Sequence, residues 1–416
     1  MIDILRVGKS KLQGQVTLSG AKNSVLRLLA ASLLTSEKIE LSNFPSGLSD
    51  AQIHADMLDV LGKKCIVSGK NIIIEQSSLC KSSLVWKGRS IRNTLLILGA
   101  LVAKTGFGSV PLPGGCKLGE RKHDLHELVL VRLGAKVWEE NESLYAEAPK
   151  GLKGADIHLP IKSTGATENA IISGCLAKGI TRVWNPHIRP EIIDLIRFLK
   201  SMGAKITIYG QEHIEIVGVE GLSGTSYSVM PDNMEAITCM VASVMTGGDI
   251  EINQFPLRDL EVPLIHLRES GAKFYKGEDS LIVRGGKCYP LDISTGPFPG
   301  INSDVQPILA AYAACAHGES RIIDLRFPGR YAYAEEMSKM GVEYRVENNM
   351  LQIAGKGGKL IGARVRALDL RAGAALVLCA LVAEGETIIE DAWQIERGYD
   401  NFAIKMLALG AKFEAL

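Results

Sequence analysis

The sequence predicts an α/β protein of two domains, and three observations support this. The chain has 416 residues, more than one hydrophobic core ordinarily serves, so two domains are expected. A phrase of the form Leu-Gly-Ala-Lys recurs six times, and each copy follows a helical pattern and precedes an alternating, strand-like pattern. Six units of about 70 residues account for the whole chain, and three plus three fit the two domains. The phrase glycines, 68 to 72 residues apart, are Gly62, Gly134, Gly203, Gly271, Gly341 and Gly410.

Each unit is predicted to contain two helices and their strands. The phrase glycine ends the second helix, because glycine adopts the left-handed conformation cheaply. Residues 192–199 show helical periodicity and residues 205–208 then alternate, whereas residues 374–382 are apolar all round and lead to a strand at 387–389. The first helix of a unit should therefore be fully buried, and the second, amphipathic helix should lie outside it.

Composition excludes several classes of protein. Apolar residues make up 46% and charged residues 22%, which is typical of globular domains, and the net charge of +1 gives no bulk attraction to nucleic acid or anionic membrane. Apolar stretches such as residues 95–103 fall short of the ~20 residues of a membrane span. The first residues lack a basic segment followed by an apolar run, so we expect a soluble, cytoplasmic protein.

The eight cysteines are scattered, with no Cys-x-x-Cys pair and no histidine at zinc-ligand spacing, so no metal site is predicted. We expect reduced thiols that mostly fill the core, and four cysteines fall in apolar helical runs. These four are Cys175, Cys239, Cys315 and Cys379.

Cys116 differs, because it lies in a loop of three glycines and a proline and is flanked by Lys117 and Arg121. Nearby positive charge makes a thiol a better nucleophile or acid. Spacing alone leaves two interpretations open, a reactive thiol or a surface cysteine in a flexible turn.

Two further features suggest anion binding. In five of the six units an arginine precedes the phrase glycine by 11 to 14 residues, which indicates either an anion site or solvated surface arginines. The turn at residues 19–22 feeds a helix N-terminus and ends in Lys22, without the spacing of a nucleotide P-loop. Asp304 precedes another buried helix, where an N-cap role is the simpler alternative. The five arginines are Arg121, Arg189, Arg258, Arg330 and Arg397.

Six segments in order along the chain carry a resemblance to the UDP-N-acetylglucosamine enolpyruvyl transferases. They are Ser-Gly-Ala-Lys-Asn at 19–23, Leu-Pro-Gly-Gly-Cys at 112–116, Asp-Leu-His at 124–126, Gly-Ala-Thr-Glu-Asn at 165–169, Asp-Leu-Arg at 369–371 and Arg-Gly-Tyr at 397–399. The resemblance implies a two-domain inside-out α/β barrel fold. One three-unit domain would span residues 22–229 and carry the Cys116 loop, and the other would combine residues 1–21 and 230–416. The active site would lie in the cleft between them.

The resemblance also implies an activity. Members of this family transfer the enolpyruvyl group of phosphoenolpyruvate to the 3-hydroxyl of UDP-N-acetylglucosamine and release phosphate, which begins peptidoglycan synthesis and so serves cell-wall growth, cell shape and division. The reaction needs no metal and no organic cofactor. The implied partners are these two small molecules, with no nucleic acid and no membrane, and the oligomeric state is not assigned.

The resemblance assigns roles by position. Cys116 would protonate C3 of phosphoenolpyruvate and is the family's target of fosfomycin, and Lys22, Arg121 and Arg397 would hold the phosphate and carboxylate. Asp304 would act as base or orienting group for the sugar hydroxyl. The remaining implied substrate-binding residues are Asn23, Arg92, Lys122, His123, Asp124, Leu125, Lys162, Ser163, Gly165, Arg326, Arg330 and Arg371.

Several positions depart from the family. Pro328-Gly329-Arg330-Tyr331 stands where Glu-Asn-Arg-Phe is usual, Arg326 replaces a small apolar residue, and Ser49 and Ile161 replace lysines. The donor site therefore matches better than the acceptor site. Another uridine nucleotide such as UMP, in a secondary-metabolite pathway, stays an alternative acceptor.

Three further classes of protein bear on this interpretation. A 5-enolpyruvylshikimate-3-phosphate synthase would share the fold, but the Gly-Gly-Cys loop and the Ser-Gly-Ala-Lys-Asn segment favour the sugar-nucleotide enzymes. A DNA sliding clamp would need basic helices around a hole, which a net charge of +1 and one apolar helix per unit do not offer. A catalytically silent binding protein is compatible with the sequence, and phosphate release would distinguish an enzyme from it.

Overall fold

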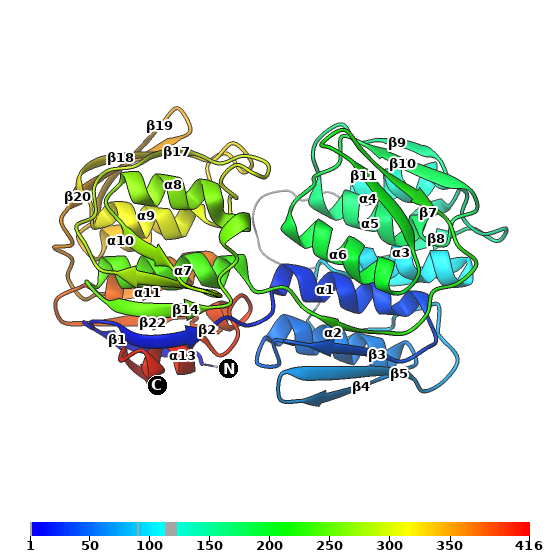
Figure 1. Cartoon of the computed structure of the whole chain (residues 1–416), viewed down its shortest axis with the longest axis horizontal. Helices are drawn as coiled ribbons and strands as arrows, with labels where there is room; N and C mark the ends of the chain where they lie inside the picture. The colour runs from blue at the N-terminus through cyan, green and yellow to red at the C-terminus, as the bar shows by residue number, and fades with distance from the viewer. Residues whose placement is uncertain (1, 90, 113–122) are drawn as a thin grey trace. The chain divides into compact units, whose positions relative to one another are not determined.

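The computed structural model describes residues 2–89, 91–112 and 123–416, and the chain divides into two compact units (Figure 1). We call Gly20–Met230 the central unit, and Met1–Ser19 together with Pro231–Leu416 the terminal unit. Within the described residues, the strands form six sheets, three in each unit. Each unit has its own hydrophobic core.

The central unit contains the first three repeats. Its sheets have the strand orders β13-β3-β5-β4, β6-β8-β7 and β11-β12-β10-β9. The helices are α1 (Lys22–Ala31), η1 (Ser32–Leu34), α2 (Ser49–Val60), α3 (Thr94–Thr105), α4 (Asp124–Arg132), α5 (Thr164–Gly174) and α6 (Pro190–Ser201). The strands are β3 (Ile39–Ser42), β4 (Lys63–Ser68), β5 (Asn71–Gln76), β6 (Phe107–Pro111), β7 (Lys136–Glu140), β8 (Ser143–Glu147), β9 (Asp156–His158), β10 (Ile180–Trp184), β11 (Lys205–Tyr209), β12 (His213–Val217) and β13 (Thr225–Ser228).

The terminal unit contains the other three repeats, with sheets in the orders β15-β16-β14-β2, β17-β18-β20-β19 and β21-β22-β1-β23. Its helices are α7 (Asn233–Met245), η2 (Leu257–Leu260), α8 (Glu261–Glu269), α9 (Gln306–Ala314), α10 (Tyr333–Ser338), α11 (Leu370–Ala380), α12 (Trp393–Glu396) and α13 (Phe402–Ala408). Its strands are β1 (Ile4–Gly8), β2 (Gln13–Thr17), β14 (Asp249–Asn253), β15 (Lys273–Lys276), β16 (Ser280–Arg284), β17 (Asp292–Ser294), β18 (His317–Ile323), β19 (Glu343–Glu347), β20 (Met350–Lys356), β21 (Arg364–Arg366), β22 (Glu386–Glu390) and β23 (Lys412–Ala415).

The repeats share one pairing pattern. In the third repeat β9 runs parallel to β10, and β12 pairs antiparallel with both β10 and β11. The parallel edge strand of a sheet need not come from the same stretch of chain. β2 leads into α1 but pairs with β14, and β13 leads into α7 but pairs with β3.

The layering follows the predicted pattern, with apolar helices inside and sheets around them. In the terminal unit α7, α9 and α11 contact one another, and in the central unit α3 contacts α1 and α5. Every residue of α9 and α11 is buried, because both are apolar on all sides. The outer helices bury one face only, as in α6. The structure thus confirms the expected α/β fold of six repeats with inner helices.

The predicted helix stops are also confirmed. All six phrase glycines have positive φ, between +88° and +100°, immediately before the next strand begins. A side chain at such a position is strained, so glycine specifies the end of each second helix.

The cysteine predictions hold in part. The four cysteines assigned to apolar helical runs are buried, and so is Cys288. Cys65 and Cys80 are only partly buried and pack against the edge of the core. Cys116 lies outside the described residues. Within the described part of the chain, none of the helices is both long and apolar enough to cross a membrane.

Candidate active site

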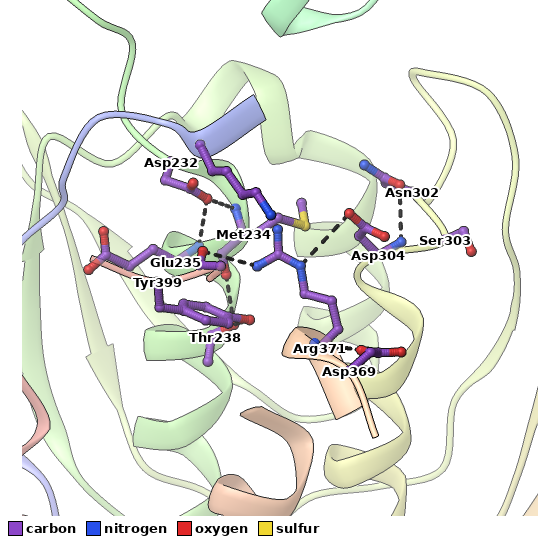
Figure 2. Close-up of polar contacts among 12 residues, drawn as sticks. Asp232, Met234, Glu235, Thr238, Asn302, Ser303, Asp304, Asp369, Arg371 and Tyr399 are labelled. Atoms are coloured by element: carbon purple, nitrogen blue, oxygen red, sulfur yellow. Dashed lines mark hydrogen bonds and ion pairs between the residues drawn. The ribbon is translucent and has the colours of Figure 1, made fainter. Parts of the chain in front are cut away.

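The starts of the three inner helices of the terminal unit carry a cluster of charged side chains (Figure 2). Asp232 caps α7 and accepts hydrogen bonds from the backbone N–H of Met234 and Glu235. Asp369 caps α11 in the same way. Arg371, the second residue of α11, points into the cluster.

Asp304 lies between two arginines in this cluster. Its Oδ1 is 3.1 Å from Nη1 of Arg330, and its Oδ2 is 3.8 Å from Nε of Arg371. Nη2 of Arg330 lies 3.7 Å from Asp369. Burial disfavours the charge of Arg330, but the two carboxylates outweigh burial and raise its pKa.

The N-cap interpretation of Asp304 is wrong. Helix α9 begins at Gln306, and its cap residue, Val305, makes no side-chain cap. The backbone N–H of Asp304 instead donates to Oδ1 of Asn302 at 3.1 Å. The carboxylate is therefore available to the arginines rather than to the helix end.

Arg371 is 1% exposed and is among the largest fully buried side chains described. Its guanidinium carbon lies 4.9 Å from the ring centroid of Tyr399. Nη1 is 3.5 Å from the carbonyl oxygen of Gly398. The Tyr399 hydroxyl is 2.9 Å from Oγ1 of Thr238 on α7.

Two other predicted arginines of this unit lie in different surroundings. Arg397 is buried and donates a 2.8 Å hydrogen bond to Oε1 of Gln394. Arg326 is exposed, with its guanidinium 5.7 Å from the ring of Phe327. The buried carboxylate of Asp324 fixes this loop by accepting from the backbone N–H of Arg326 and Phe327 at 2.9 Å.

In the central unit, Lys22 begins α1 and is buried. The turn before it requires glycine at position 20, because an added Cβ would lie 2.0 Å from the carbonyl oxygen of Asn43. Nζ of Lys22 is 2.9 Å from Oδ2 of Asp50, whose Oδ1 is 2.6 Å from Nη2 of Arg89. Asp50 is thus a buried carboxylate shared by two cations.

A second group in the central unit forms around His126. Ser163 caps α5 by accepting from the backbone N–H of Ala166 at 3.4 Å. A Cβ at position 165 would lie 2.7 Å from Nε2 of His126, so Gly165 lets the imidazole pack on the helix start. Burial, and secondarily the charge of Arg92, lower the pKa of His126 to about 3. The imidazole is therefore neutral at pH 7.

The other predicted residues of the central unit are more open to solvent. His123 lies 2.7 Å from Glu139, Asp124 is exposed at the start of α4, and Leu125 is partly buried. Asn23 and Lys162 are also partly buried. Cys116, Arg121 and Lys122 lie outside the described residues.

The five loop arginines do not form one set. Arg189 makes two 2.7 Å hydrogen bonds to the buried carboxylate of Glu191, so a carboxylate of the chain itself balances its charge. Arg258 is exposed on η2. Arg258 thus fits the solvated-surface alternative, and Arg330 and Arg397 lie buried or nearly so in the terminal unit.

Sequence reasoning missed four residues that support these side chains: Asp50, Arg89, Asp369 and Tyr399. Asp369 and Tyr399 belong to the Asp-Leu-Arg and Arg-Gly-Tyr segments, so their position in these motifs could have identified them as site residues. Nothing in the local sequence distinguished Asp50 or Arg89 from surface residues.

The sequence also matches a known family over most of its length. The family model described as EPSP synthase (3-phosphoshikimate 1-carboxyvinyltransferase) matches residues 7–406. The chain belongs to this enolpyruvyl transferase family. Family members are carboxyvinyl-transferring enzymes, and so is this protein.

Relatives that match nearly the whole chain are UDP-N-acetylglucosamine 1-carboxyvinyltransferases. The UDP-N-acetylglucosamine 1-carboxyvinyltransferase 1 of Carboxydothermus hydrogenoformans is 41% identical over 410 residues, covering 98% of this chain and 97% of the relative. The UDP-N-acetylglucosamine 1-carboxyvinyltransferase of Finegoldia magna is 37% identical over 421 residues, covering 100% and 99%.

Solved structures of enolpyruvyl transferases share the fold. The enolpyruvyl transferase NikO from Streptomyces tendae superposes with a TM-score of 0.89 at 24% identity, covering 100% of this chain and 99% of the other. EPSP synthase from Acinetobacter baumannii gives a TM-score of 0.77 at 17% identity, covering 99% of both chains. At these identities the likeness shows the fold alone.

Proposed function

We propose that this protein transfers the enolpyruvyl group of phosphoenolpyruvate to the 3-hydroxyl of UDP-N-acetylglucosamine and releases phosphate. The observation that carries the proposal is the near full-length identity of 37–41% to bacterial UDP-N-acetylglucosamine 1-carboxyvinyltransferases. This activity would place the protein in the cytoplasm at the start of peptidoglycan synthesis, and so in cell-wall growth and division.

The proposed reaction is an addition followed by an elimination. The sugar hydroxyl releases its proton to solvent as its oxygen bonds to C2 of phosphoenolpyruvate, and C3 gains a proton. C3 then loses a proton as the C2–O bond to phosphate breaks and inorganic phosphate leaves. The steps need an acid at C3, a group at the hydroxyl and cations against the donor's phosphate and carboxylate. We assign these roles to Cys116, Asp304, and Lys22 with Arg121 and Arg397, respectively.

The surroundings of Asp304 favour orientation over strong basicity. Two guanidinium groups lie 3.1 and 3.8 Å from its carboxylate oxygens. Cations so close stabilise the negative charge, and a stabilised carboxylate is a good hydrogen-bond acceptor but a weak base. We therefore assign Asp304 to accepting a hydrogen bond from the acceptor hydroxyl and aiming its oxygen at C2.

The test is phosphate release from phosphoenolpyruvate with four separate acceptors: UDP-N-acetylglucosamine, UDP, UMP and shikimate 3-phosphate. We expect release with the first only, and mass spectrometry should find the enolpyruvyl group on the sugar. Release with another acceptor in preference, or with none of the four, would overturn the proposal.

A further inference from the structure

Tyr399 touches the active-site cluster of the terminal unit without a place in the proposed chemistry. It is 1% exposed, so it is a core side chain rather than a surface for substrate. Burial raises its pKa, so the phenol stays neutral and presents its ring face to Arg371 at 4.9 Å. Neutral aromatic faces attract cations, more strongly when both are removed from water.

The hydroxyl of Tyr399 is anchored at the other side. Oγ1 of Thr238 donates to the carbonyl oxygen of Met234 at 2.7 Å, so its proton is already used. The Tyr399 hydroxyl must then be the donor in its 2.9 Å contact with Thr238. This contact fixes the ring against α7, as Figure 2 shows.

Arg371 has few other strong contacts. Its distances to Asp304 and to the Gly398 carbonyl oxygen, 3.8 and 3.5 Å, are long for hydrogen bonds. Among the described residues, its buried Nε has no hydrogen-bond partner. The ring of Tyr399, held in place through Thr238, is therefore a fixed surface against which this guanidinium packs.

We propose that Tyr399 is a positioning residue that holds the Arg371 guanidinium against Asp304 and so sets the direction of the Asp304 carboxylate. The inference rests on the proposed function, because it takes Asp304 as the group that meets the acceptor hydroxyl. Tyr399 thereby links α7, through Thr238, to the starts of α11 and α9 (Figure 2).

The charges around Asp304 make the effect measurable. Arg330 and Arg371 face its carboxylate directly, while Asp369 faces Arg330 and the charge of Asp232 reaches Arg371. Arg330 does not depend on Tyr399 for its contacts. Loss of the ring should then weaken one of the two cationic contacts and leave the other.

The experiment compares Tyr399→Phe, which keeps the ring, with Tyr399→Leu, which removes it. We expect kcat/KM for UDP-N-acetylglucosamine to stay within about 3-fold in the Phe variant and to fall about 30-fold in the Leu variant, mainly through kcat. The acidic limb of the pH profile should move to higher pH in the Leu variant alone, because Asp304 loses a cationic neighbour. Tyr312→Leu, which removes a buried tyrosine of α9 that bonds to Ser270, is the structural control.

A double variant separates positioning from general damage. Adding Tyr399→Leu to Arg371→Met should lower kcat/KM by less than about 2-fold relative to Arg371→Met alone, because the two side chains act as a unit. Equal damage from Phe and Leu, an unmoved pH limb, or losses that multiply in the double variant would each overturn the inference.

Failure of the proposed function is recognised separately, as absence of phosphate release in the wild type. The positioning claim is then tested without turnover, through the Nε–H resonance of Arg371, assigned with Arg371→Met. We expect a ring-current shift of this resonance that Tyr399→Phe retains and Tyr399→Leu abolishes. No such shift in the wild type would overturn the claim.

Discussion

Nζ of Lys22 lies 2.9 Å from Oδ2 of Asp50, and both side chains are buried in the central unit. The second oxygen of the same carboxylate binds Arg89, which also donates to Oγ of Ser49 at 3.3 Å. The lysine that we assign to binding the anionic donor is thus fixed by a carboxylate that it shares with a second cation.

The first prediction is that Asp50→Asn weakens both the fold and donor binding. Breaking a buried ion pair leaves uncompensated charge and costs about 3 kcal/mol of unfolding free energy. Because Lys22 also loses its fixed position, we expect KM for phosphoenolpyruvate to rise about 10-fold. Urea unfolding and steady-state kinetics measure the two effects. Asp56→Asn, at an exposed position of the same helix, is the control, and equal behaviour of the two variants would contradict the prediction.

The second prediction concerns pH and the buried His54. Burial, and then the charge of Arg27, lower its pKa to about 3, against about 6.5 in an unfolded chain. As pH falls below 6.5 the unfolded state takes up the proton first, so this histidine makes the fold less stable, and the loss grows until about pH 3. Between these two pKa values, His54 lowers the unfolding free energy by about 1.4 kcal/mol for each unit that the pH falls.

Replacing the side chain should remove that slope. Between pH 4 and 6, the unfolding free energy of His54→Gln should vary less steeply than that of the wild type, by about 1.4 kcal/mol per unit. Denaturant unfolding at several pH values measures it. His158→Gln, at an exposed position, should keep the wild-type slope, and an unchanged slope in the His54 variant would contradict the assignment.

Local rules explain which features could be predicted from the sequence. Each phrase glycine ends a helix because it adopts positive φ. Each inner helix is apolar on all sides, which predicts that it is buried. The six repeats and their layering can therefore be predicted from short stretches of sequence. The pairing of β2 with β14 could not be predicted, because the residues of a strand do not specify which other strand it pairs with.

The candidate site divides in the same way. The motif segments located Lys22 and Arg371. Asp304 lies outside those segments and was open to an N-cap interpretation, because its partners lie 26 and 67 residues further along the chain. Asp50 and Arg89 are 39 residues apart, so their ion pair exists only after folding. Long-range ion pairs depend on the tertiary structure, whereas caps and helix stops depend on neighbours.

The third prediction is that fosfomycin modifies Cys116 and no other cysteine. The chain carries internal controls, since Cys65 and Cys80 are partly exposed and burial raises the pKa of both thiols. A raised pKa leaves little thiolate at pH 7, so exposure alone should not make them react. Peptide mass spectrometry after incubation with fosfomycin and UDP-N-acetylglucosamine locates the adduct. An adduct on Cys65 or Cys80, or none on Cys116, would contradict the prediction.

The last prediction concerns Arg326, which replaces a small apolar residue of the family. An arginine buried beside a neutral sugar would lack a partner for its charge, but Arg326 is exposed and lies over the ring of Phe327. The loop holds its shape through the backbone N–H groups that donate to Asp324, which do not depend on the side chain at 326. We therefore expect Arg326→Val to change kcat/KM for UDP-N-acetylglucosamine by less than about 3-fold, the range of an exposed substitution.

The alternative to this prediction is that the acceptor is a smaller nucleotide, UMP. If Arg326 met a phosphate in place of the sugar, the wild type would prefer UMP and Arg326→Val would abolish that preference. Measuring kcat/KM for both acceptors in both proteins decides between the two cases. Arg321→Val, which removes another exposed arginine of the terminal unit, controls for loss of surface charge. Because the guanidinium of Arg326 faces an aromatic ring and solvent, we expect the two variants to behave alike.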